Sequence, residues 1–175
     1  MEELLGYCMR PDVGIVGARL YYEDDTVQHA GVVLGFGGIA GHCFVQQPRG
    51  NTGYCHRIIC AQNYSAVTAA CMMVKKEAFD KVGGLSTDLA VAFNDIDFCL
   101  KVRDAGYLVV YNPYVELYHY ESKSRGLEDT PEKRERFARE IATLEGHWPE
   151  IFAKPDPYYN PNLTLKSQDF SLKRL

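Results

Sequence analysis

The sequence predicts an α/β domain in which a mixed sheet is flanked by helices. Apolar runs typical of strands alternate along the chain with amphipathic patterns typical of helices. The 175 residues suffice for one hydrophobic core and are too few for two large ones. The composition, with 46% hydrophobic and 24% charged residues, is that of a globular protein. We therefore expect one domain over residues 1–150 and an extended, proline-containing tail over residues 151–175 that packs on it.

Five apolar runs predict strands because Val, Ile, Leu, Tyr and other apolar residues dominate them and turn residues separate them. The run AVTAACMMV, dominated by Ala, Val, Cys and Met, is expected to be a buried strand. Pro113 separates the last two runs, so we expect two short strands there. The five ranges are 13–20, 27–36, 66–74, 107–111 and 115–118.

Four segments predict helices. EELLGYC, residues 2–8, is short and ends before Pro11. KKEAFDKVGG provides one or two turns that end at one of its two glycines, because glycine readily adopts the left-handed conformation of a helix end. The last helix begins at Thr130, with Pro131 at the first helical position. It places four large apolar residues on one face: Phe137, Ile141, Leu144 and Trp148.

The remaining helix, residues 95–105, begins in the stretch AVAFNDIDFCLKVRDAGY, which holds Asn94, Asp95 and Asp97. Side-chain oxygens at a helix start accept hydrogen bonds from unpaired N–H groups and complement the helix dipole. A cap needs only one such residue, so we expect one carboxylate to be available for chemistry. The structural alternatives are an N-cap role for Asp95 and a helix-dipole role for Asp97. The helix is expected to turn four residues toward the core: Ile96, Cys99, Leu100 and Ala105.

Charge and cysteine content exclude several classes of function. The net charge of −4 gives no general attraction to nucleic acid or to anionic lipid. The sequence has no apolar run of about 18 residues and no signal-peptide pattern at its start, which predicts a soluble, cytoplasmic protein. Its six cysteines form no CxxC pair and no zinc-type grouping, so a reducing compartment is expected.

The run TAACMMVKKEAFDKVGGLSTDLAVAFNDIDFCLKVRDAGYLVVYNPYVELYHYES resembles the second half of the nucleotide-sugar-binding core of family 2 glycosyltransferases, the inverting GT-A enzymes. QHAGVVLGFGGIAGH before it, and SRG, DPYYNPNL and DFSL after it, resemble the subgroup associated with rhamnose-containing and O-antigen polysaccharides. The resemblance implies a partial GT-A fold that lacks the N-terminal nucleotide-binding half. It also implies transfer of a sugar, with inversion, from a nucleotide-diphosphate donor to a saccharide acceptor in surface polysaccharide biosynthesis.

The resemblance assigns a role to several residues. Asp95 takes the place of the general base, while Asn94 stands where the family usually has glutamate, and Asp97 is a second candidate in the same motif. His119 matches a histidine that joins a divalent metal, Mg²⁺ or Mn²⁺, bridging the donor diphosphate; a structural histidine is the alternative. Thr68 lies where the family has Thr-Gly-Ala near the donor.

Three further interpretations concern the periphery of this site. Ala69 replaces the family glycine, and its methyl group is expected to narrow the approach to the sugar. Ser124 and Arg125 are expected to face the diphosphate or the acceptor, because a guanidinium suits phosphate. His29 and His42, in QHAG and AGH, are interpreted as packing residues.

The family's Asp-x-Asp motif, which provides most of the metal binding, is missing, so we expect an incomplete chain that is inactive alone. The alternative is a non-catalytic accessory module that binds glycan or a partner. A metal-dependent hydrolase using Asp95, Asp97 and His119 is a third hypothesis, disfavoured because no second ligand cluster exists. Loss of the first half would expose apolar surface, which predicts a homodimer. Peripheral association with a membrane-bound acceptor is also expected.

Overall fold

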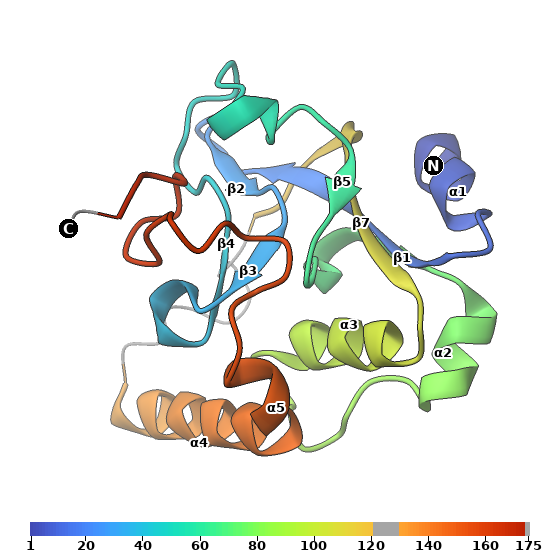
Figure 1. The fold of residues 1–175 in the computed structure, drawn as a ribbon, viewed down its shortest axis with the longest axis vertical. Helices are drawn as coiled ribbons and strands as arrows, with labels where there is room; N and C mark the ends of the chain where they lie inside the picture. The colour runs from blue at the N-terminus through green and yellow to red at the C-terminus, as the bar shows by residue number, and fades with distance from the viewer. Residues whose placement is uncertain (121–129, 174–175) are drawn as a thin grey trace.

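The computed structural model describes residues 1–120 and 130–173 and confirms a mixed α/β architecture (Figure 1). The main sheet has five strands, four of them in the order β2-β1-β7-β5. The fifth, β6, pairs with the first half of β1, on the same edge where β2 pairs with the second half. The strands β3 and β4 form a separate two-stranded sheet. The strands are β1 Val13–Tyr21, β2 Val27–His29, β3 Val32–Leu34, β4 Ala40–His42, β5 Gln62–Asn63, β6 Met72–Val74 and β7 Leu108–Tyr118. The α-helices are α1 Glu2–Cys8, α2 Lys76–Val82, α3 Asn94–Asp104, α4 Pro131–His147 and α5 Pro149–Phe152. Three short 3₁₀ helices complete the described elements: η1 Phe36–Gly38, η2 Tyr54–His56 and η3 Ala69–Cys71.

The two faces of the sheet bury different apolar clusters, because successive side chains of a strand point to opposite faces. Ile15 belongs to the larger cluster, which includes residues of α3, α4 and the tail, whereas its neighbour Val16 belongs to a smaller cluster under α1. Figure 1 shows α3, α4 and α5 grouped together and α1 by itself near the N-terminus. The helix α3 is therefore held against the large core, with its first residues at the edge of that core.

The pairing of β1 with β7 is parallel and runs nearly the whole length of both strands. The sequence predicted two strands around Pro113, but β7 is one strand with a register shift at this point. Ala18 pairs with Asn112, and the next residue, Arg19, pairs with Glu116. The irregularity accommodates Pro113, which has no N–H to donate to a regular ladder. The strand thus continues to Tyr118, directly before His119.

The prediction of one buried strand over residues 66–74 was wrong. Only Met72–Val74 is a strand, while residues 69–71 form η3, and Ala69 and Ala70 are exposed. Thr68 caps η3, since its Oγ1 accepts a hydrogen bond of 3.3 Å from the Ala70 N–H. Apolar composition alone does not distinguish a strand from such a turn.

The segment just before η3 nevertheless packs tightly against β1. A Cβ atom on Gly17 would lie 2.5 Å from Cβ of Val67, so glycine is required for this close approach. The predicted extended run over residues 27–36 is likewise interrupted. Gly31, with a φ of +99°, separates β2 from β3, which belong to different sheets.

The helix predictions are confirmed with small shifts. The α2 helix ends at Gly83 in the left-handed conformation, and α4 follows the Thr130 cap, with Pro131 in its first turn. The α3 helix begins one residue earlier than expected, at Asn94, and Ala105 lies after its end, half-buried. It buries three more side chains than the sequence indicated: Asp97, Phe98 and Val102.

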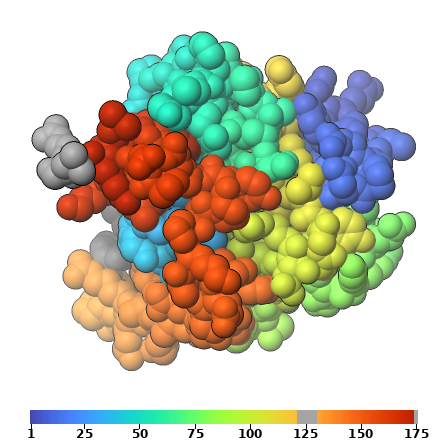
Figure 2. Space-filling model, viewed as in Figure 1, coloured from blue at the N-terminus to red at the C-terminus, as the bar shows by residue number. Residues whose placement is uncertain are grey.

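The C-terminal segment adds side chains to the large core. Phe170 stacks on Phe44 with ring centroids 4.6 Å apart, and the Leu34 N–H donates to the carboxylate of Asp156 at 2.8 Å. In Figure 2 this segment, coloured red, lies over the blue region that includes β3. Within the described ranges no helix has both the length and the apolar character needed to cross a lipid bilayer.

Candidate functional site

Asp95 lies in the first turn of α3 and is half-buried. Its Oδ2 accepts a hydrogen bond of 3.1 Å from the Ala69 N–H, and its Oδ1 accepts one of 2.9 Å from the Ile96 N–H. The N-cap position itself is occupied by Phe93, whose φ is +61° and which makes no side-chain cap. Asp95 therefore pairs with one N–H group of the helix start and also reaches across to η3.

The structure brings two predicted site residues, Thr68 and Asp95, into one neighbourhood. Thr68 immediately precedes Ala69, whose main chain holds the Asp95 carboxylate. Asn94, the first residue of α3, is also half-buried, and no side-chain hydrogen bond to it is found among the described residues. The acidic helix start and the η3 turn thus form one polar region, although 26 residues separate Ala69 from Asp95 in sequence.

Asp97 is placed very differently, in the interior between α3 and α4. Its side chain is 1% exposed, and it accepts hydrogen bonds from Ser86 Oγ at 2.6 Å, His147 Nδ1 at 3.0 Å and Trp148 Nε1 at 2.9 Å. Burial alone would raise the pKa of Asp97, but these hydrogen bonds outweigh it and lower the pKa below its ordinary value. The contacts of this carboxylate are therefore those of a packing residue, directed away from solvent.

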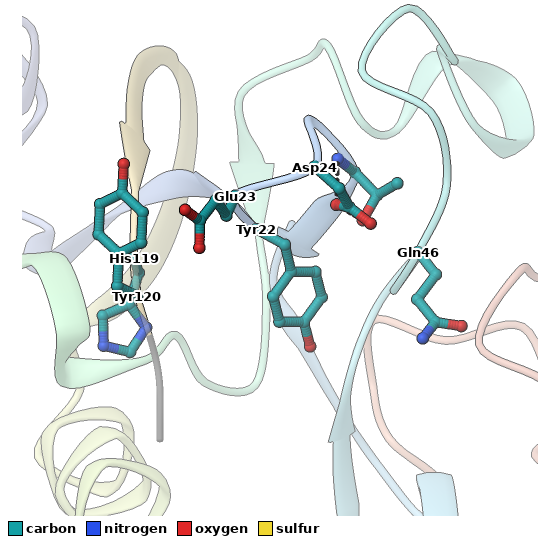
Figure 3. Close-up of a pocket in the computed structure, with 7 residues that line it drawn as sticks. Tyr22, Glu23, Asp24, Gln46, His119 and Tyr120 are labelled. Atoms are coloured by element: carbon teal, nitrogen blue, oxygen red, sulfur yellow. Dashed lines mark hydrogen bonds between the residues drawn. The ribbon is translucent and has the colours of Figure 1, made fainter. Parts of the chain in front are cut away.

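His119 follows the end of β7 and lines a cleft of about 480 Å³ (Figure 3). Its main-chain N–H donates to the Tyr21 carbonyl at 3.0 Å. Its ring Nδ1 lies 2.8 Å from Gln28 Oε1, and Gln28 Nε2 donates to the His119 carbonyl at 3.0 Å. The other lining residues are Tyr22, Glu23, Asp24, Thr26, Gln46 and Tyr120. Asp95 is not one of them, so the cleft and the acidic helix start are separate features of the chain.

The donor atoms near His119 determine how well it fits a metal ion. A ligating histidine usually donates its other ring N–H to an oxygen acceptor, as the Nδ1 of His119 is placed to do toward Gln28. Glu23 and Asp24 line the same cleft, but Asp24 Oδ1 already accepts hydrogen bonds from the main chain and hydroxyl of Thr26. Among the described residues no three His, Cys, Asp or Glu side chains are arranged to hold a metal. In this part of the chain His119 is thus placed by its Gln28 contact, and no set of three such ligands surrounds it.

One residue near the cleft was not identified from the sequence, and a second was interpreted as a packing residue, which its burial supports. Gln28 was not singled out, and His29 was interpreted as a packing residue. His29 is fully buried, and its Nε2 accepts long hydrogen bonds of 3.4 Å from the N–H groups of Gly31 and Thr68. Burial lowers the pKa of His29 well below its ordinary value, and the neighbouring His42 lowers it further. The two residues are consecutive in the QHAG motif, but Gln28 contacts His119 whereas His29 contacts the main chain of Gly31 and Thr68.

Two other predicted residues, Ser124 and Arg125, lie outside the described residues.

Comparison with known proteins gives relatives that match nearly the whole chain. It is 56% identical over 173 residues, 98% of its length, to the uncharacterized protein y4gI of Sinorhizobium fredii. It is 37% identical over 176 residues, 99% of its length, to the O-antigen biosynthesis protein RfbC of Myxococcus xanthus. A shorter match, 32% identical over 34% of the chain, is to N-acetylglucosaminyl-diphospho-decaprenol L-rhamnosyltransferase of Mycobacterium tuberculosis, of which it covers 20%.

The chain spans only 19% of the Sinorhizobium protein and 13% of RfbC, so it is similar to a part of each. No family model and no solved structure matches it. The names of RfbC and of the rhamnosyltransferase suggest a glycosyltransferase-like family.

Proposed function

We propose that this chain carries the acceptor-side part of an inverting glycosyltransferase that acts in surface polysaccharide biosynthesis. The similarity to an O-antigen biosynthesis protein extends over 99% of the chain, and a rhamnosyltransferase matches a third of it. Its donor is a nucleotide-diphospho-sugar, in the class of dTDP-rhamnose or a UDP-hexose, and its acceptor is a saccharide.

The geometry of Asp95 is the observation on which the proposal depends. The carboxylate is half-buried at the tip of α3 and is fixed by two main-chain N–H groups, from Ala69 and Ile96. Each oxygen accepts one of these bonds and keeps further lone-pair capacity for an incoming hydroxyl. A carboxylate held in this way is oriented before the substrate arrives, which is what general base catalysis requires.

In the proposed reaction Asp95 takes the proton of the acceptor hydroxyl while that oxygen attacks the anomeric carbon of the donor sugar. The new bond joins the acceptor oxygen to the anomeric carbon, and the bond from that carbon to the phosphate oxygen breaks with its electron pair. The nucleoside diphosphate leaves, and the configuration of the sugar is inverted. General base catalysis of this kind typically contributes about 10²–10⁴ in rate.

Three other residues have supporting roles in this proposal. Asn94 can orient a sugar hydroxyl, since its amide both donates and accepts. The hydroxyl of Thr68 can donate to the substrate while its oxygen caps η3. A bound Mg²⁺ or Mn²⁺ ion would offset the charge on the departing diphosphate, and His119 is the residue of this chain that would hold it.

One observation favours a second candidate function, a non-catalytic module that binds glycan or a partner protein. Asp95 does not line the cleft beside His119, whereas a catalytic site of this kind brings the base and the donor diphosphate to one sugar. If the chain has this second function, the His119 cleft binds a glycan or a partner protein and takes no part in catalysis.

Calorimetric titration of the chain with UDP-sugars and dTDP-sugars, with and without Mn²⁺, separates the two candidates. Micromolar binding of at least one donor would support the first candidate, and no binding at millimolar concentration would favour the accessory module. In a transfer assay of the intact parent enzyme, Asp95→Asn should lower the rate by about 10²–10⁴. Asp104→Asn, an exposed carboxylate at the other end of α3, is the matched control and should leave the rate unchanged. A rate that survives Asp95→Asn would remove the base assignment.

A further inference from the structure

Gln28 makes two hydrogen bonds to a single distant residue, His119. It is the central residue of β2 and is 1% exposed. Its amide nitrogen donates to the His119 carbonyl at 3.0 Å, and its amide oxygen lies 2.8 Å from the His119 ring nitrogen Nδ1. The two residues are 91 positions apart, and β1 lies between their strands in the sheet. A buried side chain therefore fixes both the main chain and the ring of His119.

The chemistry of these contacts allows only one orientation of the Gln28 amide. A carbonyl oxygen can only accept a hydrogen bond, so the atom that faces the His119 carbonyl must be the amide nitrogen. A turned amide would place its own oxygen against that carbonyl and bury two acceptors together. The amide oxygen is thus the atom that faces Nδ1, and because it too can only accept, Nδ1 must carry a proton.

We propose that Gln28 is a positioning residue that holds neutral His119 in the tautomer with the proton on Nδ1, so that Nε2 presents a lone pair at the cleft. His119 lines this cleft (Figure 3), and its Nε2 makes no hydrogen bond among the described residues. In water the neutral histidine side chain prefers the opposite tautomer, with the proton on Nε2. Gln28 therefore converts the Nε2 of His119 from a donor into an acceptor.

The role of that lone pair rests on the proposed function. A neutral imidazole with an available nitrogen can ligate a divalent cation or accept a hydrogen bond from a sugar hydroxyl, whereas an N–H group can do neither. The tautomer itself is a property of this chain alone and can be measured without a sugar or a metal.

His42 provides a control within the same protein. Its Nδ1 lies 3.1 Å from the main-chain carbonyl of Gln28, which can only accept, so His42 should also carry its proton on Nδ1. A substitution of the Gln28 side chain removes the partner of His119 but leaves this main-chain acceptor in place.

The test is nitrogen-15 NMR of the histidine rings in the 175-residue chain, at a pH where His119 is neutral, because the ring nitrogen shifts distinguish the tautomers. The chain has five histidines, and His119→Asn assigns the signal of interest. We expect the Nδ1–H pattern for His119 in the wild type. In Gln28→Leu the His119 pattern should shift toward Nε2–H while that of His42 is unchanged.

An Nε2–H pattern for His119 in the wild type, or an unchanged pattern in a folded Gln28→Leu variant, would overturn the proposal. If Gln28→Leu does not fold, which the His42 signal reports, the wild-type tautomer decides the question. Failure of the proposed function has a different signature. The calorimetric titration would then show no nucleotide-sugar binding, while the wild-type tautomer would still be Nδ1–H.

Discussion

Asp97 and His147 are joined by a 3.0 Å hydrogen bond between Oδ1 and Nδ1, which connects the first turn of α3 to the end of α4. The other ring nitrogen of His147 lies 3.0 Å from Oδ2 of Asp88. The imidazole is thus placed between two carboxylates, an arrangement that favours its protonated form. Because Asp95 lies two residues before Asp97, this contact also helps to hold the helix tip that carries the candidate base.

Replacement of Asp97 by asparagine should destabilise the protein strongly. The amide nitrogen would replace one carboxylate oxygen. It would face either Ser86, which donates to Oδ2, or His147 and Trp148, which donate to Oδ1. Loss of one partner of a buried charged network typically costs about 3 kcal/mol of unfolding free energy. The urea unfolding midpoint measures the effect, with exposed Asp104→Asn as the control. Equal midpoints for the two variants would contradict this role for Asp97.

The His147 contact also predicts a dependence of stability on pH. The hydrogen bond with Asp97 is the main cause that raises the pKa of His147, and the nearby Asp88 carboxylate adds to it. A group whose pKa is raised on folding contributes stability that is fully present below its unfolded pKa, about 6.5, and is lost as the pH rises through the folded pKa. We therefore expect the thermal midpoint to fall as the pH rises above neutral.

At low pH the same hydrogen-bond network makes stability depend on pH in the opposite direction, through Asp97. The pKa of Asp97 is lowered because its hydrogen bonds outweigh the effect of burial, so its stabilisation is lost as the pH falls below about 4. Lys101, whose Nζ lies 3.8 Å from Oδ2 of Asp97, is a further cationic neighbour of this carboxylate. The His147→Gln variant should lack the alkaline decline and keep the acid one. An unchanged alkaline decline in that variant would rule out His147 as its source.

The Ala69 N–H can be removed by a substitution that the local backbone tolerates. Thr68 has a φ of −76° and a ψ of 144°, which suits a residue that precedes proline, and Ala69 is the first residue of η3. Ala69→Pro therefore deletes the hydrogen bond to Asp95 while the turn remains. We expect the free energy of unfolding to change by less than about 1 kcal/mol. In the intact parent enzyme the transfer rate should fall about tenfold, because only the Ile96 N–H then orients the carboxylate.

Ala69→Ser, which keeps the N–H group, is the matched control for this prediction. If the proline and serine variants transfer sugar at the same rate, the Ala69 contact does not orient the base.

Local sequence signals identified the helices and their ends. Gly83, Thr130 and Pro131 act through their own backbone preferences, which do not depend on the rest of the fold. The 66–74 run failed because its small apolar residues fit a strand and an exposed turn equally well. Tertiary contacts favour the turn over the strand, above all the close packing of Val67 on Gly17 and the hydrogen bond between Ala69 and Asp95.

The candidate site was predictable only in part for the same reason. The helix-start pattern identified Asp95 and Asp97 as a polar pair, but their spacing did not reveal that one is half-buried at the surface and the other fully buried. The two carboxylates differ in their hydrogen-bond partners, which come from distant parts of the chain: Ala69 for Asp95 and His147 for Asp97. Gln28 was missed because a lone glutamine in an apolar strand gives no signal until its partner 91 residues away is known.

The central claim, that the Asp95 carboxylate meets the substrate, is tested most directly by amide NMR of the chain during titration with nucleotide sugars, Mg²⁺ and a rhamnose-containing oligosaccharide. The amides of Ala69 and Ile96 donate to this carboxylate and report on it individually. We predict that both shift in a saturable manner and that the shifts disappear in Asp95→Asn but persist in Asp104→Asn. If ligands bind elsewhere on the protein and these two amides do not move, Asp95 is not the base.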